Sequence, residues 1–478
     1  MVITIFEKSK GGVSAIEILK LDVPDTGRIP KELERDFLEL PEVSEIEVIR
    51  HYIQLSRRNF GVDLGFYPLG SCTMKYSPKI NEEIANFEGF SGLHPYVPLS
   101  FSQGSLKLMY GLSSFLKEIS GMDAVSLQPA AGAHGELTGI MIMKVYFEKK
   151  QEKRTKIMIP DSAHGTNPAT VTMCGFTCMQ VKSSSKGSLD IDDLKAKIDS
   201  DTVGLMLTNP NTLGIFDENI LEIIKIVHDN GSLVYCDGAN LNANMGIVRV
   251  GDLGFDMIHF NLHKTFSTPH GCGGPGSGPL GVKEYLAEFL PNPTIIEEKN
   301  GGRESYKLDY SKNSIGKVKA FYGNFTVLVK AYAYIMGLGA EGIKNAAENA
   351  VLNANYMMSK LKKHYNLPYD RICQHEFVID DSRMENNVTT NDIAKRLLDY
   401  GFHAPTVYFP LIVKGAMMIE PTETESKETL DRFCDVMIKI KEESKTDQDK
   451  VKNAPWKMPV KRVDAVKAAR ELDVVFNK

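Results

Sequence analysis

The chain has 478 residues, with 56 Lys or Arg against 61 Asp or Glu, and its formal net charge is -5 at pH 7. A chain without a positive surplus has no general attraction for the phosphates of nucleic acids or anionic lipids, which argues against both as partners. Residues 1–10 lack the apolar core of a signal peptide, and no stretch approaches the roughly 20 apolar residues of a membrane span, so we expect a cytoplasmic protein.

The first part of the chain contains few regular elements. Residues 1–60 mix charged stretches with prolines around one helical pattern at 44–56, which is typical of an arm that packs against another surface. From residue 61 to residue 127, Gly, Pro and Ser surround a helical block at 103–119, and this indicates loops that build a site.

The middle of the chain alternates helices with short apolar strands. Helices are expected at 133–149 and 217–229, and strands at 156–160, 202–209, 233–237 and 256–260. Continuously apolar strands are buried on both faces, so residues 61–330 are predicted to form a large α/β domain with a mostly parallel sheet. Ligands bind at the carboxyl ends of the strands in such a sheet.

Residues 331–478 have a different pattern and are predicted to form a smaller α+β domain. Helices are expected at 331–363, 391–400 and 426–443, a strand at 372–379, and a second apolar run of the same kind at 408–413. The tail from Lys445 onward is charged and contains prolines, and we expect it to be an extended surface segment.

The strongest chemical signal is Lys264, which follows the expected strand at 256–260 and precedes a glycine-rich turn. A lysine at the end of a buried strand, between His263 and Thr265, is well placed as an amine nucleophile. Asp237 ends the preceding apolar strand, where a carboxylate can pair with a protonated pyridine nitrogen, and the small Ala239 leaves room for a flat ring.

Three further loops complete this pattern. Ala131, Gly132 and Ala133 lead directly into a helix, whose free amides and dipole suit an anion such as a cofactor phosphate. His164 follows another strand and can stack on a ring, while Asn209 can donate to a phenolic oxygen.

Each of these features also has an ordinary explanation. Lys264 taken alone is typical of a surface loop, Asp237 of a helix cap or turn, and His164 of a structural loop residue. Cys174 and Cys178 stand four apart without a second ligand pair, so we interpret them as ordinary thiols and expect no metal. The combination of Lys264 with Asp237 favours a pyridoxal 5'-phosphate (PLP) site.

With these residues assembled, the chain resembles the P-protein family of the glycine cleavage system, glycine dehydrogenase (decarboxylating). The motifs that carry the resemblance cover most of the chain and are far more specific together than singly. They are Tyr67–Lys75, Ala131–Glu136, His164–Pro168, Asp237–Asn240, His263–Thr265 and Ile419–Glu423. One departure is Cys272, which stands in the glycine-rich tail where the family pattern has glycine.

The resemblance implies an aminotransferase-like fold of type I with PLP as cofactor. It makes Lys264 the Schiff-base lysine, Asp237 the partner of the ring nitrogen and His164 the stacking group. It places the phosphate at Ala131, Gly132 and Ala133, with Asn209, His263, Thr265 and Ala239 beside the cofactor. The loop Ser71-Cys72-Thr73 is predicted to form the wall of the substrate pocket, the alternative being a structural turn after Pro68.

The resemblance also implies the reaction and the partners. Glycine would lose its carboxylate as CO2, and the aminomethyl group would pass to the lipoyl arm of the H-protein. The length resembles the C-terminal half of the long single-chain form, which implies a heteromer with glycine dehydrogenase subunit 1, with two copies of each.

Two alternatives stay open at this point. An aminotransferase would need a carboxylate-binding Arg among Arg371, Arg383, Arg396 and Arg432, and a cysteine desulfurase would need a mobile Cys, for which Cys373 is a poor candidate. The other alternative is a catalytically silent scaffold subunit, against which the presence of both Asp237 and Lys264 argues.

Overall fold

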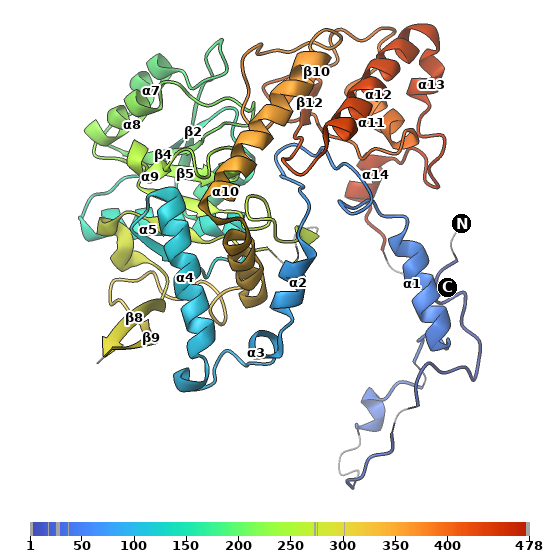
Figure 1. Cartoon of the computed structure of the whole chain (residues 1–478), viewed down its shortest axis with the longest axis horizontal. Helices are drawn as coiled ribbons and strands as arrows, with labels where there is room; N and C mark the ends of the chain where they lie inside the picture. Colours follow the sequence, from blue (N-terminus) through green and yellow to red (C-terminus); the bar gives the residue numbers. More distant parts are fainter. Residues whose placement is uncertain are drawn as a thin grey trace. The chain divides into compact units, whose positions relative to one another are not determined.

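The computed structural model describes residues 3–17, 19–24, 29–36, 38–271, 274, 276–300 and 302–474 (Figure 1). The chain divides into two compact units, Met1–Gly65 and Phe66–Lys478.

The first unit has little regular structure. Its elements are η1 (Lys31–Leu33) and α1 (Glu45–Ser56). α1 agrees with the helix that the sequence predicts at 44–56. Along it, Ile46, Ile49 and Ile53 are each about half exposed and follow helical spacing, so they form an apolar stripe open to solvent.

A seven-stranded sheet forms the centre of the second unit, in the order β1-β7-β6-β5-β4-β2-β3. All neighbouring strands from β6 to β3 are parallel, while β7 pairs antiparallel with both β6 and β1. The strands are β1 (Ala124–Ser126), β2 (Lys156–Pro160), β3 (Thr177–Val181), β4 (Thr202–Thr208), β5 (Leu233–Gly238), β6 (Met257–Phe260) and β7 (Leu280–Val282). The sheet is therefore mostly parallel, as predicted.

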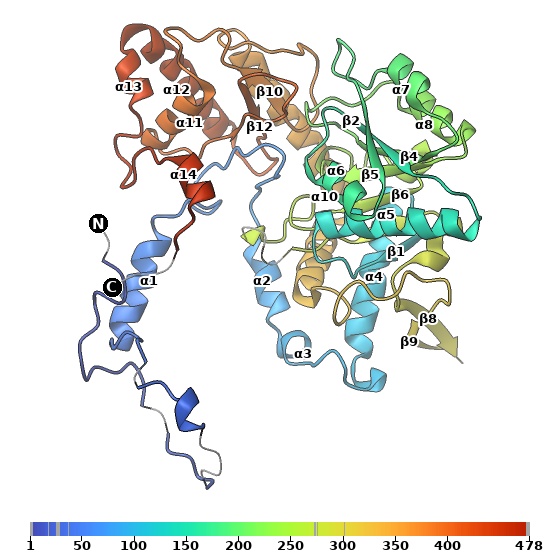
Figure 2. The ribbon, with the colours of Figure 1, turned by 180° about the vertical axis from the view of Figure 1, so that it is seen from behind.

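Helices cover both faces of this sheet, and Figure 2 shows α5 on one side with α4 and α10 on the other. Alternate residues of a strand point to opposite faces. Tyr235 on β5 accordingly packs with α5, α6 and η5, whereas Val234 and Cys236 pack with α4, α8 and α10. This two-sided burial explains why the central strands are apolar at every position.

The helices of the sheet region lie close to the predicted ones and add several short elements. They are α2 (Lys79–Ala85), α3 (Glu88–Ser91), η2 (Leu99–Phe101), α4 (Gln103–Ser120), α5 (Gly132–Lys149), α6 (Thr166–Met173), α7 (Ile191–Lys197), α8 (Ile220–Asp229), η3 (Leu241–Ala243), α9 (Val250–Leu253) and η5 (Glu284–Phe289). A hairpin of β8 (Thr294–Asn300) and β9 (Arg303–Asp309), which the sequence analysis did not predict, follows them.

The C-terminal part contains an antiparallel three-stranded sheet in the order β10-β12-β11, packed with helices in its own apolar core. Its elements are α10 (Phe325–Leu361), β10 (Phe377–Asp380), α11 (Thr390–Asp399), β11 (Thr406–Val407), β12 (Ala416–Ile419), α12 (Lys427–Thr446), α13 (Gln448–Lys452) and α14 (Ala465–Arg470). α10 carries a kink at Gly339, where the backbone has a φ of 64°.

Two expectations for this part are wrong. The apolar run 408–413 is not a strand, because Pro410 has no amide hydrogen to donate to a neighbouring strand, and the segment forms a turn. The strand that pairs with β10 is β12. The tail after Lys445 is not simply extended, since it forms α13 and α14 and buries Val451.

None of the helices among the described residues has the length and apolar character that crossing a bilayer requires.

Close packing of α5 on β5 gives a first prediction. A Cβ on Gly139 would lie 2.3 Å from a ring carbon of Tyr235, which is fully buried. Gly139→Ala should therefore destabilise the chain by about 1–3 kcal/mol in denaturant unfolding, the usual cost of overpacking. Gly337→Ala is the control, because that exposed helical glycine has no atom within 4 Å of the added group. Equal stability of the two variants would contradict this packing.

Candidate active site

Lys264 lies in the turn after β6, at the carboxyl edge of the parallel strands. Its amide donates to the Asn261 carbonyl at 3.0 Å, and its side chain is half-buried. The charge of Lys264 acts electrostatically on Asp237 and also on Glu376 and Glu420 from the C-terminal part. The amine and the carboxylate that the sequence analysis paired thus belong to one site.

Asp237 lies at the end of β5 and is 3% exposed. Its Oδ1 accepts a hydrogen bond from the Ala239 amide at 2.9 Å, and its Oδ2 accepts from Asn167 Nδ2 at 3.1 Å. The strand register places His259 of β6 directly opposite, with Nε2 3.3 Å from Oδ1. Asp237 is held by neighbours from three elements.

The surroundings of Asp237 keep it ionised. Burial by itself would raise the pKa of Asp237, but His259, the Ala239 amide, the Asn167 side chain and the charge of Lys264 oppose it and lower the pKa overall. Burial lowers the pKa of His259, so its ring is neutral. Its Nε2 lies 3.3 Å from both Asp237 Oδ1 and Asn261 Nδ2, and its Nδ1 shares a hydrogen bond with the Tyr235 hydroxyl at 2.8 Å.

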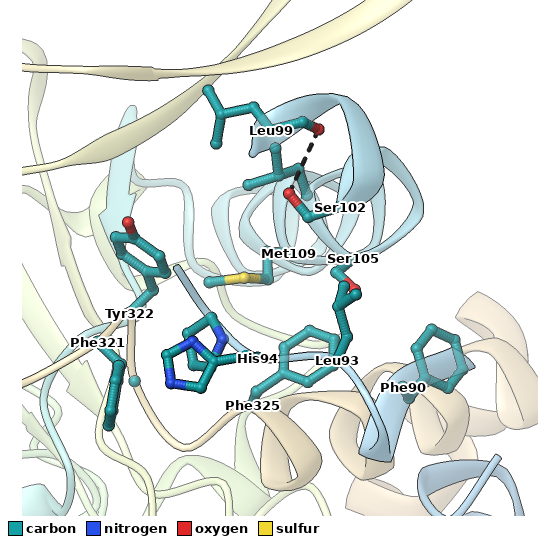
Figure 3. Close-up of a pocket in the computed structure, with 13 residues that line it drawn as sticks. Phe90, Leu93, His94, Leu99, Ser102, Ser105, Met109, Phe321, Tyr322 and Phe325 are labelled. Atoms are coloured by element: carbon teal, nitrogen blue, oxygen red, sulfur yellow. Dashed lines mark hydrogen bonds between the residues drawn. The ribbon is translucent and has the colours of Figure 1, made fainter. Parts of the chain in front are cut away.

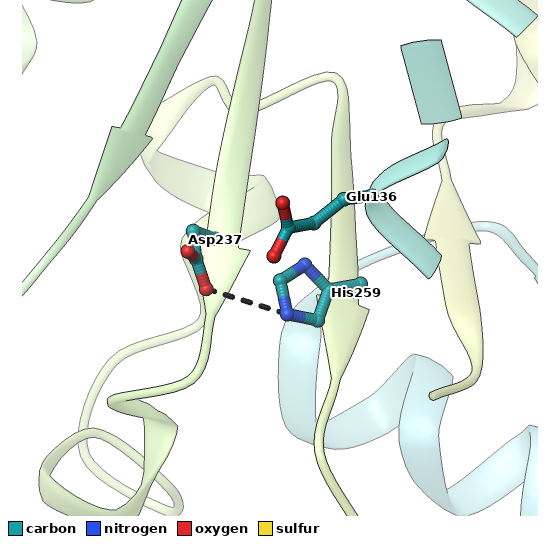
Figure 4. Close-up of side chains that lie close together, drawn as sticks. All are labelled: Glu136, Asp237 and His259. Carbon is teal, nitrogen blue, oxygen red and sulfur yellow. Dashed lines mark ion pairs between the residues drawn. The ribbon is translucent and has the colours of Figure 1, made fainter. Parts of the chain in front are cut away.

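Glu136 is a buried member of this cluster to which the sequence analysis gave no role. Figure 4 shows it beside Asp237 and His259, and one ligand atom of each lies within 4.8 Å of the others. Its Oε2 accepts from Asn167 Nδ2 at 3.0 Å, so one amide joins the two carboxyl groups.

A signal for the burial of Glu136 was present in the sequence. Gly132, Gly135 and Gly139 recur at helical spacing, and added Cβ atoms there would strike Asn261, His259 and Tyr235. Small residues at this spacing mark the face of α5 that meets the sheet. Glu136 lies on that face and is 4% exposed.

Burial and the nearby charge of Asp237 raise the pKa of Glu136 to about 8. Glu136 is therefore the neutral acid of the pair at neutral pH, and Asp237 carries the negative charge.

The loop predicted for a phosphate leads into α5. Ala131 precedes the helix in an extended conformation and gives it no side-chain cap. A Cβ on Gly132 would lie 2.1 Å from Asn261 Oδ1, so only glycine fits there. Ala133 is exposed. The first amides of an 18-residue helix are thus available to an anion.

The remaining predicted residues lie on loops at the same edge of the sheet. His164 is exposed, follows β2 and makes an edge contact with Phe409, at 5.4 Å between ring centroids. Asn209 follows β4, and its Oδ1 accepts from the Asp217 amide at 3.0 Å. Within the described residues, the buried atoms Asn209 Nδ2, His263 Nδ1 and Thr265 Oγ1 have no hydrogen-bond partner.

The loop Ser71-Cys72-Thr73 is held from the C-terminal part. Ser71 and Thr73 have φ values of 66° and 43°, which residues other than glycine rarely adopt. The Ser71 amide donates to Glu376 Oε2 at 2.7 Å, and the Thr73 amide donates to Glu420 Oε2 at 2.9 Å. The charge of Lys264 also acts on Cys72, so the loop borders the same site.

Other sequence expectations fall outside this site. Cys272 lies outside the described residues, and Cys174 and Cys178 are free thiols. The C-terminal arginines are engaged elsewhere: Arg371 with the Lys186 carbonyl, Arg383 with the Lys362 carbonyl, Arg396 with Glu443, and Arg432 over the ring of Phe402.

A second, apolar cavity lies between the start of α4 and the segment before α10 (Figure 3). It holds about 80 Å³ of space, and its walls include Phe90, His94, Met109, Phe321 and Tyr322. In the part of the chain that the structure describes, none of the predicted site residues lines it.

Comparisons with known proteins agree on family and fold. The family model "Glycine dehydrogenase, C-terminal domain" matches residues 346–461, and "Aminotransferase class-V" matches residues 136–303. A relative from Caldanaerobacter subterraneus subsp. tengcongensis, named probable glycine dehydrogenase (decarboxylating) subunit 2, is 59% identical over 99% of this chain and 98% of its own. A relative of the same name from Chloroherpeton thalassium is 55% identical over 99% and 97%.

Solved structures share the fold at low identity. A glycine decarboxylase (P-protein) in inhibitor-bound form has a TM-score of 0.73 at 18% identity, covering 86% of this chain and 93% of that one. The cysteine desulfurase of Thermococcus onnurineus has a TM-score of 0.62 at 16% identity, covering 79% and 95%. The predicted type I, aminotransferase-like fold is thereby confirmed.

The buried Glu136 gives a second prediction, about stability and pH. The folded chain keeps a proton on Glu136 between pH 4.5 and about 8, whereas the unfolded chain releases it, so this group makes stability fall as pH rises. Glu136→Gln removes this loss of stability, because glutamine does not ionise. The variant side chain has the same size and still offers an oxygen that accepts from Asn167. The melting temperature of the variant should rise relative to native protein from pH 5 to pH 8. Glu148→Gln, an exposed change on the same helix, should show no such trend.

Proposed function

The chain belongs to the family of glycine dehydrogenase (decarboxylating) subunit 2, and from this premise we propose that it uses PLP to remove CO2 from glycine. The aminomethyl group then passes to a lipoyl disulfide on the glycine cleavage H-protein. The observation that supports this best is that Asp237 lies at the carboxyl end of β5 and that Lys264 follows the carboxyl end of β6, the parallel strand beside it.

The residues around Lys264 suit PLP in their chemistry. Lys264 offers the amine for the aldehyde, Asp237 a carboxylate for the ring nitrogen, and His164 a flat ring with exposed surface. Unpartnered Asn209 Nδ2 is a buried donor suited to the phenolic oxygen, and His263 and Thr265 have further unsatisfied atoms. When bound, PLP supplies a protonated ring that withdraws the electron pair released at the substrate α-carbon.

Asp237 holds the proton of the ring nitrogen in this proposal. Its own pKa is lowered despite its burial, because Asn167, Ala239 and His259 surround it. Glu136 supports this role by staying neutral, so that no second negative charge competes beside Asp237. The phosphate would be held at Ala131, Gly132 and Ala133, where peptide amides and the helix dipole supply positive potential without a basic side chain.

The substrate end of the site favours glycine chemistry over transamination. An aminotransferase binds the substrate carboxylate with an arginine. Each of the four arginines that the sequence offers for this role instead contacts a group outside the site. The loop Ser71-Cys72-Thr73 forms the pocket wall in the proposed site. A silent scaffold subunit would need neither Lys264 nor Asp237.

The family name also implies a second subunit. We propose a heteromer with glycine dehydrogenase subunit 1, two copies of each, in the cytoplasm. The exposed stripe Ile46, Ile49 and Ile53 on α1 supports an arm at residues 1–60 that a partner covers. Residues 61–330 would act as the large domain and residues 331–478 as the small one.

Lys264→Ala gives the third prediction. The complex with subunit 1 should lose the visible absorbance of lysine-linked PLP and should not release CO2 from glycine, because the amine that joins the cofactor is gone. Lys150→Ala, which changes an exposed lysine on the end of α5, should keep both properties. Normal turnover of the Lys264 variant would rule out the role of this lysine.

Asp237→Asn separates binding from chemistry and gives the fourth prediction. The variant should still bind PLP through Lys264, but CO2 release should fall on the order of 100-fold, the effect expected when a preorganised charge partner is removed. Absorbance titration with PLP and a glycine decarboxylation assay measure the two properties. Unchanged decarboxylation would contradict the assignment of Asp237.

A further inference from the structure

A second buried cluster lies on the C-terminal side of Lys264. His375, Glu376 and Glu420 are at most 1% exposed, and His375 Nε2 lies 4.0 Å from Glu376 Oε1 and 3.9 Å from Glu420 Oε1. The sequence analysis named Glu420 only within a shared motif. The proposed roles of Lys264 and Asp237 leave this cluster without a function.

The cluster holds at least one proton. Burial and then the charge of Lys264 lower the pKa of His375 to about 3, so its ring is neutral. Neither ring nitrogen of His375 has a hydrogen-bond partner among the described residues. Two buried carboxylates with one nearby ammonium cannot both stay ionised at low cost, and the pair therefore retains a proton.

The two acids differ in how readily they exchange that proton. Burial and the proximity of Glu420 raise the pKa of Glu376 well above its ordinary value. Burial raises the pKa of Glu420 to about 7, with Thr73 and Lys264 opposing and Glu423 adding to the shift. Glu420 is thus the member that can give up and regain a proton near neutral pH.

Three further ionisable groups act electrostatically on this pair: Glu423, the Cys373 thiol and the Cys72 thiol. Cys72 is the one on the predicted substrate wall, between the two anchored residues Ser71 and Thr73. Burial raises the pKa of Cys72. The charge of Lys264 lowers this pKa, and the charges of Glu420 and Glu376 raise it further. Cys72 therefore stays a thiol and does not supply the proton more readily than Glu420.

The proposed reaction needs such a proton. Glycine loses CO2, and the electron pair left on the α-carbon forms a bond to one sulfur of the lipoyl disulfide. The sulfur–sulfur bond breaks, its electron pair goes to the second sulfur, and that sulfur takes up one proton to become a thiol. The glycine carbon is oxidised, the disulfide is reduced, and a buried site must deliver the proton itself.

We propose that Glu420 donates this proton to the departing lipoyl sulfur, and that the amide and hydroxyl of Thr73 position it. The proposal rests on the proposed function. Glu420 borders the same site as Lys264, and its Oε1 and Oε2 both contact Thr73 of the predicted substrate wall, at 2.5 and 2.9 Å. The donor thus stands at the wall where the disulfide would enter.

A structural role of Glu420 has to be separated from proton donation, because its carboxyl also anchors the strained loop. Glu420→Gln is the suitable variant: its oxygen accepts from the Thr73 amide, and the Thr73 hydroxyl can turn to accept from its NH2 group. Thr406→Val is the comparator, because it removes the hydrogen bond that the Thr406 hydroxyl donates to the Gly70 carbonyl beside the loop and leaves the contacts of Glu420 with Thr73 in place.

The fifth prediction compares two acceptors in the PLP-loaded complex with subunit 1. Lipoamide releases an aliphatic sulfur that needs a proton, whereas 5,5'-dithiobis(2-nitrobenzoate) releases an aromatic thiolate that is stable without one. Glu420→Gln should lower glycine-dependent CO2 release by about 100-fold or more with lipoamide, the usual size of general acid catalysis, and by less than about 10-fold with the aromatic disulfide.

Thr406→Val should change both rates by the same factor, because it touches the loop anchor and not the acid. Equal losses with the two acceptors in Glu420→Gln, or no loss with lipoamide, would overturn the proposal. Native complex that releases no CO2 from glycine with either acceptor would instead disprove the proposed function.

A measurement without turnover tests the proton directly. Infrared spectra of the cofactor-free full chain should show a carboxylic acid carbonyl band that titrates near pH 7, and Glu420→Gln should remove that titration. A native chain with no carboxyl group titrating near neutral pH would overturn the assignment whatever the activity assays show.

Discussion

Four buried acids around one lysine amine set the electrostatic problem that this site has to solve. Glu136 and Asp237 come from one side, and Glu376 and Glu420 from the other, each 4% exposed or less. A single ammonium cannot neutralise four carboxylates in a medium that solvates charge poorly. Protons therefore have to stay in the site, and the hydrogen bonds around each acid decide which groups keep them.

The fold assembles these groups from distant parts of the chain. Parallel pairing of β5 with β6 places Asp237 opposite His259, and α5 brings Glu136 onto the same face. The antiparallel sheet of the C-terminal part brings the residues beside β10 and β12, Glu376 and Glu420, to the loop Ser71-Cys72-Thr73. The large sheet alone brings the first acid pair to Lys264, whereas the second pair joins it through the C-terminal sheet.

The sequence was informative wherever a local pattern decides the outcome. The strands β2, β4, β5 and β6 were predicted because burial on both faces makes them apolar at every position, and Lys264 and Asp237 followed from their places at strand ends. The roles of Glu136, Glu376 and Glu420 were missed, because a glutamate in a helix or beside a strand usually faces water and only long-range packing buries it. The run 408–413 does not form a strand, although its apolar composition suggests one, because Pro410 cannot donate a backbone hydrogen bond to a neighbouring strand.

The two acid pairs are built from similar parts but suit opposite tasks. Asp237 has His259 Nε2 at 3.3 Å together with two amide donors, and this set overcomes burial and lowers its pKa. Glu420 also accepts from two donors, the amide and hydroxyl of Thr73, yet burial and the nearby Glu423 prevail and raise its pKa. A fixed negative charge suits the end of the site where a ring proton must be kept, and an exchangeable proton suits the end where a sulfur must be protonated. The neighbours of each acid thus account for the difference between the two ends: His259, the Ala239 amide and Asn167 act on Asp237, whereas a second carboxyl group, Glu423, acts on Glu420.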